Sequence, residues 1–148
     1  MESNAIILKF GPLLVAVALS AGCATTYTPT SGEQMATVRN VGLGDPRLCI
    51  KGKVYSPPKS NDASDGFEVP AGSRITIDAE WSFMGATMNT LCHQSLSFVP
   101  TYGRTYVLNS GPHGGRCMME LVRIDASSST GLAIERSVWR GICGLDLP

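Results

Sequence analysis

Residues 73–83 read SRITIDAEWSF and carry the clearest secondary-structure signal in the chain. Apolar side chains occupy alternate positions of this stretch: Ile75, Ile77, Ala79, Trp81 and Phe83. Polar or charged residues fill the positions between them. Because successive side chains of a β-strand point to opposite faces, the alternation predicts a strand with one buried and one solvated face. It also places Trp81 in the core.

Shorter runs of the same kind occur along most of the remaining chain. They cover residues 36–41, 48–55, 91–99, 105–109, 116–124 and 132–139. Sixteen glycines and nine prolines separate them, and beyond the first 22 residues no window shows a helical period. About seven strands at this spacing predict an all-β fold, an antiparallel β-sandwich forming one domain over residues 35–148.

The first 22 residues predict an export signal. Residues 5–22 are mostly apolar, but their uninterrupted part, residues 13–18, is far shorter than the roughly 20 residues of a spanning helix. Lys9 precedes the apolar core and small residues follow it, as in secretory signals. An ordinary cut after Ala21 or Gly22 is one interpretation of this pattern.

The other interpretation comes from the four residues before Cys23, LSAG, which resemble the lipobox of bacterial lipoproteins. The resemblance implies that Cys23 is diacylated and becomes the N-terminal residue. Two acyl chains hold a domain firmly on a bilayer. Ala24, in place of an aspartate, implies sorting to the outer membrane, with the domain in the periplasm. Residues 24–34 are small and polar and predict a flexible tether after the lipidated cysteine.

Four cysteines remain after Cys23, an even number that predicts two disulfides in an oxidising compartment. Sequence alone allows three pairings, and strand parity ranks them. Cys92 and Cys117 share the parity of apolar neighbours and are expected to point inward. Cys49 shares its face with lysines and is expected to point outward. This favours a Cys92–Cys117 bond in the core and a Cys49–Cys143 bond that holds the C-terminal tail over the outer face.

A second resemblance covers residues 67–125. Its ordered residues are Pro70, Gly72, Trp81, Cys92, Phe98, Pro100, Gly103, Tyr106 and Cys117. This set resembles a group of small uncharacterised proteobacterial lipoproteins. The shared features are turns, core positions and cysteines, so the resemblance implies a fold type and an envelope location rather than an activity. Cys49 and Cys143 lie outside the matched part.

No sequence motif predicts an enzyme. His93 follows Cys92, but neighbouring side chains of a strand point to opposite faces and cannot share a proton. Met84, Met88 and His93 are soft ligands suited to Cu(I), which makes copper handling an alternative. The competing interpretation is that these methionines are loop residues. No cofactor is expected.

Trp139 is the candidate contact residue. Its parity along the strand is opposite to that of Leu132 and Ile134, so it is expected on the other face. If that face is solvated, Trp139 with Arg136 or Arg140 forms a contact patch. Trp and Arg are the residues that dominate binding hot spots. The alternative is that the C-terminal segment folds across Trp139 and buries it.

These features predict a non-enzymatic envelope lipoprotein that acts as a binding or structural module. Its expected partners are the membrane, through the lipid, and an envelope protein or cell-wall component. Twelve basic and twelve acidic residues cancel, so net charge gives no attraction to nucleic acid or to an anionic membrane face. Inhibition of a cell-wall lytic enzyme is a narrower alternative.

Overall fold

The computed structural model describes residues 25–58, 66–85 and 88–144, so the export signal and Cys23 lie outside the described residues. Strands, turns and loops make up all of this part of the chain. It therefore contains no helix long and apolar enough to cross a membrane.

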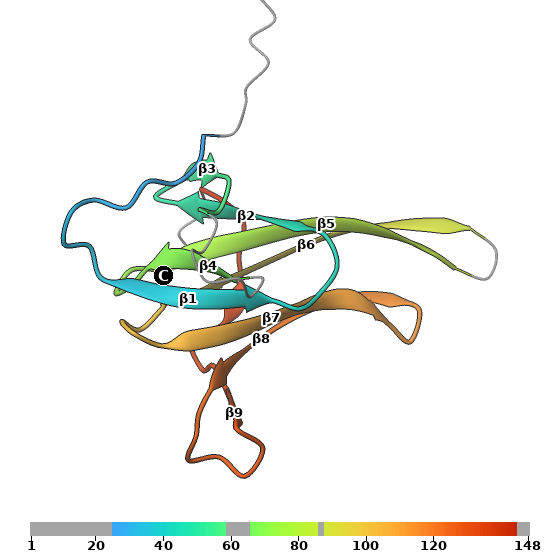
Figure 1. Cartoon of the computed structure of the whole chain (residues 1–148). Helices are drawn as coiled ribbons and strands as arrows, with labels where there is room; N and C mark the ends of the chain where they lie inside the picture. The colour runs from blue at the N-terminus through green and yellow to red at the C-terminus, as the bar shows by residue number, and fades with distance from the viewer. Residues whose placement is uncertain (1–24, 59–65, 86–87, 145–148) are drawn as a thin grey trace, which may run out of the picture.

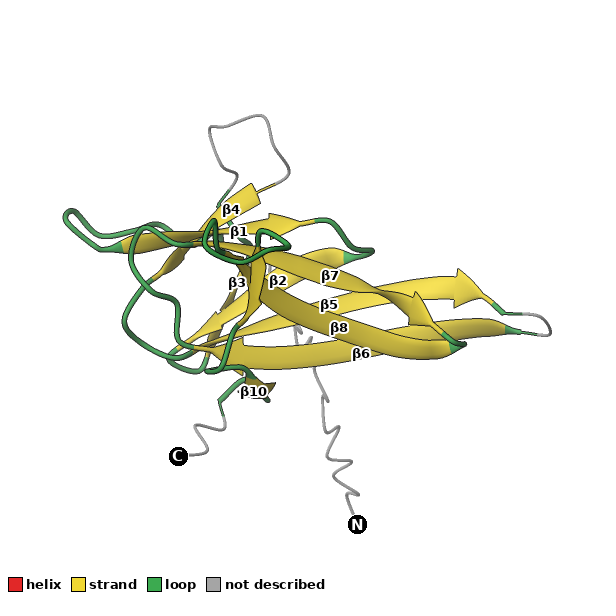
Figure 2. Ribbon diagram, turned by 90° about the horizontal axis from the view of Figure 1, so that it is seen from below, coloured by secondary structure: helices red, strands yellow, loops and turns green. Residues whose placement is uncertain are grey.

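Two five-stranded sheets form the β-sandwich (Figures 1 and 2). The first sheet has the order β4 (Gly66–Pro70), β1 (Met35–Asn40), β7 (Thr105–His113), β8 (Arg116–Ile124) and β9 (Leu132–Ile134). The second sheet has the order β10 (Trp139–Arg140), β6 (Asn89–Phe98), β5 (Ile75–Met84), β2 (Asp45–Ile50) and β3 (Lys53–Tyr55). Every neighbouring pair is antiparallel except β1 and β7, which run parallel. The all-β prediction is confirmed.

The described chain has ten strands rather than about seven, and two predicted strands are divided. Residues 48–55 form β2 and β3, because Lys51 and Gly52 both have positive φ, 50° and 74°, as the tightest hairpin turns require. Residues 132–139 pass from β9 in the first sheet to β10 in the second. Parity therefore cannot be carried from one end of that segment to the other, and β4 was not predicted at all.

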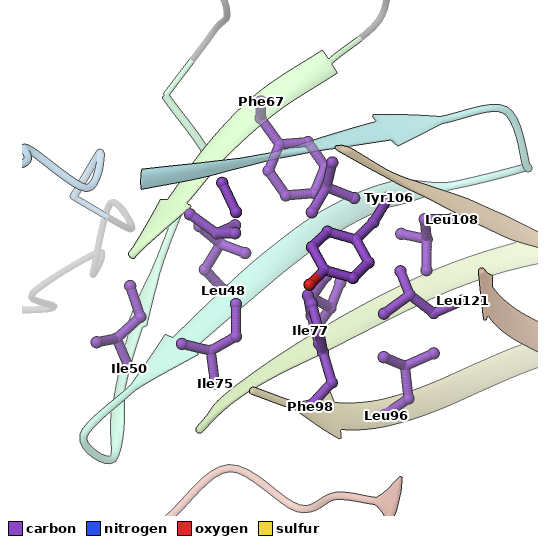
Figure 3. Close-up of a cluster of buried hydrophobic side chains, with 13 residues drawn as sticks. Leu48, Ile50, Phe67, Ile75, Ile77, Leu96, Phe98, Tyr106, Leu108 and Leu121 are labelled. Carbon is purple, nitrogen blue, oxygen red and sulfur yellow. The ribbon is translucent and has the colours of Figure 1, made fainter. Parts of the chain in front are cut away.

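The main core lies between the sheets (Figure 3). Tyr106 is fully buried at its centre, and its ring meets Phe98 edge to face with centroids 5.0 Å apart. The Tyr106 hydroxyl accepts a hydrogen bond from the Thr101 N–H at 3.0 Å, which satisfies the one polar group on the ring. Ile75 and Ile77 face the same core, as the alternation predicts.

A second, smaller core lies between two long hairpins. The β5–β6 and β7–β8 hairpins extend together beyond the remaining strands (Figures 1 and 2). Trp81 and Cys92 are buried between them, and Met119 packs against this cluster. The Cys92–Cys117 disulfide ties β6 to β8 here. The hairpins are therefore crosslinked through their interior.

The predicted flexible tether is shorter than expected. Thr26 bridges to Ser56 at the end of β3, and the ring of Tyr27 packs edge to face on Tyr55 at 5.4 Å. The Tyr27 hydroxyl donates to the Glu33 carboxylate at 2.8 Å. Burial, with the nearby Glu33 carboxylate, raises the pKa of Tyr27 to about 12. Aromatic packing and these hydrogen bonds attach the chain to the domain from residue 25 onward.

Candidate binding surfaces

The residues considered for chemistry are not brought together. Cys92 is 1% exposed and disulfide-bonded, while His93 is exposed on the opposite face of β6. His93 is the register partner of Glu80, four positions along β5 from Met84. This separates His93 from Met84 by about 13 Å, too far for one ion. Met88 is exposed near the hairpin tip.

Over the described ranges, no group of three or more His, Cys, Asp or Glu side chains is placed to hold a metal. For the copper alternative, the finding that bears on its own ligands is the separation of His93 from Met84 along the β5–β6 hairpin.

The outer face of the second sheet carries the most organised surface. Five residues are successive register partners across its five strands. In order, they are Val54, Cys49, Thr76, Ser97 and Trp139. Because directly paired residues project to the same side of a sheet, these side chains form one row on the outer face.

The C-terminal segment Gly141–Cys143, which we call the strap, runs along this row on its outer side. Gly141 lies on Ser97 so closely that an added Cβ would be 2.7 Å from the serine Cβ. Cys143 is bonded to Cys49, with the two Cα atoms 5.5 Å apart. The strap therefore runs from the β10 edge over β6 and β5 to β2. It buries the outward-facing side chains of Thr76 and Ser97.

The two disulfides in the structure are the pairs that parity favours, and the outer bond holds the C-terminal tail as expected.

Trp139 is 65% exposed, so the strap crosses the sheet without burying it. The alternative that the C-terminal segment covers Trp139 is wrong, because Gly141 turns onto Ser97 rather than back over the indole. Arg136 and Arg140 are exposed in the same segment. Arg140 follows Trp139 in the strand, so it points to the other side of the sheet edge.

Two further exposed apolar residues on the same sheet face as Trp139 were not predicted. Ile142 in the middle of the strap is 64% exposed, and Val54 at the far end of the row is 43% exposed. With Trp139, they place apolar side chains at both edges and at the centre of one sheet face. We call this set of three the strap face. Sequence gave no signal for it, because its members are brought together by pairing between distant segments.

Charged residues differ between the two ends of this sheet face. At the end that holds the β2–β3 turn, the exposed cations are Lys51, Arg74 and Arg136. Lys53 and Arg140 are paired with the core residues Ile50 and Leu96, so both project to the other side of the sheet. Asp45, Asp78 and Glu80 lie on the outer face toward the hairpin tip, with Arg47 paired to Asp78. The Glu135 carboxylate accepts hydrogen bonds from the Ser137 N–H at 2.9 Å and hydroxyl at 2.7 Å.

The Arg74 guanidinium donates to the Ser137 carbonyl at 3.1 Å. This hydrogen bond joins the residue before β5 to the segment before β10.

The first sheet also has an exposed apolar region. Val107, Val122 and Ile134 are register partners on its outer face. Ile134 is 81% exposed and Leu132 is 42% exposed, although the prediction of a solvated face at Trp139 implied that the opposite face, with Leu132 and Ile134, is buried. The reason is that β9 is the edge strand of this sheet and these side chains point away from the core.

Comparison of this chain with protein families, with curated proteins and with solved structures finds no match.

Proposed function

We propose that this protein is an envelope lipoprotein, held on the outer membrane by lipid on Cys23, whose β-sandwich is a non-enzymatic binding module. The observation that carries the proposal is the strap face. Trp139 is exposed there on a surface fixed by backbone pairing to Ser97 and by the Cys49–Cys143 bond. A preorganised surface loses little conformational freedom on binding, and exposed Trp and Arg are the side chains most used in binding hot spots.

The position of the described N-terminus fixes which edge of the domain a lipid on Cys23 holds near the bilayer. Thr25 lies two residues after Cys23 in the sequence and already contacts the domain, since its carbonyl accepts a hydrogen bond from the Ser56 N–H at 3.0 Å. Two residues of extended chain reach at most about 7 Å. A lipid on Cys23 therefore keeps the β3 edge close to the membrane.

Intact mass measurement of the protein extracted from membranes tests the anchor. We expect an N-terminus at Cys23 carrying acyl mass, and four hydrogens fewer before reduction than after it. Cys23→Ser is expected to remove the acyl mass and to let a high-salt wash release the protein from membranes. A mature N-terminus without acyl mass would show that the anchor assignment is wrong.

Crosslinking in intact envelopes tests the binding surface. Trp139→Ala is compared with Tyr102→Ala, because Tyr102 is 64% exposed in the β6–β7 turn and so matches Trp139 in type and accessibility. We expect the crosslinked component to be lost with Trp139→Ala and kept with Tyr102→Ala. Equal crosslinking by both variants would place the contact elsewhere.

A further inference from the structure

We infer that the strap face binds the anionic surface of a phospholipid bilayer, so that the second sheet lies flat on the membrane that carries the anchor. The orientation rests on the proposed lipid on Cys23. The surface chemistry does not, since it follows from the described residues alone. Three features support the inference: the place where the chain enters the domain, the exposed apolar side chains of the strap face, and the cations at the chain-entry end of the sheet.

The chain enters the domain at one edge of the strap face. Thr26 is bridged to Ser56 beside β3, and Gly144 at the other end of the described chain lies beside Gly52 in the β2–β3 turn. Trp139 is four strands away on β10, a distance of about 19 Å at the usual strand spacing. An anchor at β3 and an inserted Trp139 can reach the same bilayer only if the outer face of the second sheet lies along it.

The apolar residues suit the headgroup region of a bilayer. Trp139 and Ile142 are each about two-thirds exposed, and Val54 is next to the chain entry. Tryptophan is enriched at membrane interfaces, where its ring is apolar on one side and its N–H remains hydrated.

The charges favour a bilayer over a protein partner. Lys51 lies in the β2–β3 turn at the chain entry, and Arg74 and Arg136 are exposed at the same end of the sheet. Such a cluster is attracted to anionic headgroups close to the surface. The sequence, with equal numbers of acids and bases, argued against this attraction. The fold overrides that argument only at the chain-entry end, because Asp45, Asp78 and Glu80, with Arg47 among them, lie on the same face toward the hairpin tip.

Vesicle sedimentation of residues 24–148 tests the inference without the lipid, and this chain retains both complete sheets and both disulfides. Vesicles of phosphatidylcholine alone are compared with vesicles of equal parts phosphatidylcholine and phosphatidylglycerol. We expect binding to the anionic vesicles that weakens as salt rises. Lys51→Glu and Trp139→Ala are each expected to lower the partition coefficient by about tenfold.

Arg116→Glu and Ile134→Ala are the matched controls, because Arg116 is exposed at the β7–β8 tip and Ile134 is 81% exposed on the first sheet. Both are expected to bind as the wild type does. All four changes are at exposed positions, and thermal unfolding checks that each variant is folded.

Quenching by brominated phosphatidylcholine locates the inserted side. We expect strong quenching of tryptophan fluorescence in the wild type and its loss in Trp139→Phe, which leaves only the buried Trp81. Absence of binding to anionic vesicles, or an equal loss in the control variants, would overturn the inference. Trp139-dependent crosslinking to a protein without vesicle binding would assign the face to a protein partner. These vesicle experiments need no acyl chain. Vesicle binding can therefore be absent although Cys23 is lipidated, and it can be present although Cys23 carries no lipid.

Discussion

Removal of the outer disulfide by the double change Cys49→Ala and Cys143→Ala is the sharpest stability test of this structure. The two cysteines are 94 residues apart in the sequence. Closing a loop of that length lowers the conformational entropy of the unfolded chain. In the loop-entropy model this raises the free energy of the unfolded chain by about 4.7 kcal/mol at 25 °C. The native state also loses the bond that holds the strap over Thr76 and Ser97. We expect the free energy of unfolding to fall by about 4 to 5 kcal/mol.

Guanidinium unfolding followed by tryptophan fluorescence measures this change, since Trp81 is 5% exposed in the second core and reports on it. The denaturant dependence, m, is expected to rise, because an unfolded chain without the long crosslink exposes more surface. The comparison is the double change Cys92→Ala and Cys117→Ala. Its separation of 25 residues predicts a loop-entropy loss of about 3.5 kcal/mol, to which the loss of packing at a buried position is added.

A loss below about 2 kcal/mol for the outer pair, with m unchanged, would refute the reasoning. A value that small is at the low end of the stabilisation that disulfides give, and it is too small for a bond that closes a long loop. Non-reducing peptide mapping gives an independent check. A fragment that joins Cys49 to Cys92 would contradict both bonds.

Two further predictions follow from the strap and the N-terminal segment. Gly141→Ala should lower the free energy of unfolding by about 1 to 3 kcal/mol, since the added Cβ would be 2.7 Å from that of Ser97. The control Gly111→Ala should leave the free energy of unfolding unchanged, because a Cβ there meets nothing within 4 Å. Equal denaturation midpoints for the two variants would contradict the strap contact. Because folding raises the pKa of Tyr27 from 10.0 to about 12, its neutral form is favoured in the native state. The stabilising contribution is present below pH 10 and is lost between pH 10 and 12. An absorbance titration should show a late-ionising tyrosine that disappears in Tyr27→Phe, and an unchanged titration would place Tyr27 away from Glu33.

The sequence determined the features that depend on neighbours within one strand. The alternation in residues 73–83 predicts which face of β5 is buried, and the same parity places Cys92 and Cys117 inward. These predictions succeed because the two faces of a strand are fixed by the backbone, whatever the strand pairs with. The all-β class follows from the same local signal, repeated between turns.

Only the tertiary structure decided which segments cover which faces. Trp139 pairs with Ser97, 42 positions earlier in the chain, and the parallel pairing of β1 with β7 joins segments separated by most of the second sheet. The exposure of Trp139 depends on the path of the strap, and the place of Lys51 beside the chain entry depends on the β2–β3 turn. Alternation within a strand carries no information about contacts between distant segments. The strap face therefore exists only in the folded chain, where a C-terminal disulfide and a two-residue turn bring its residues together.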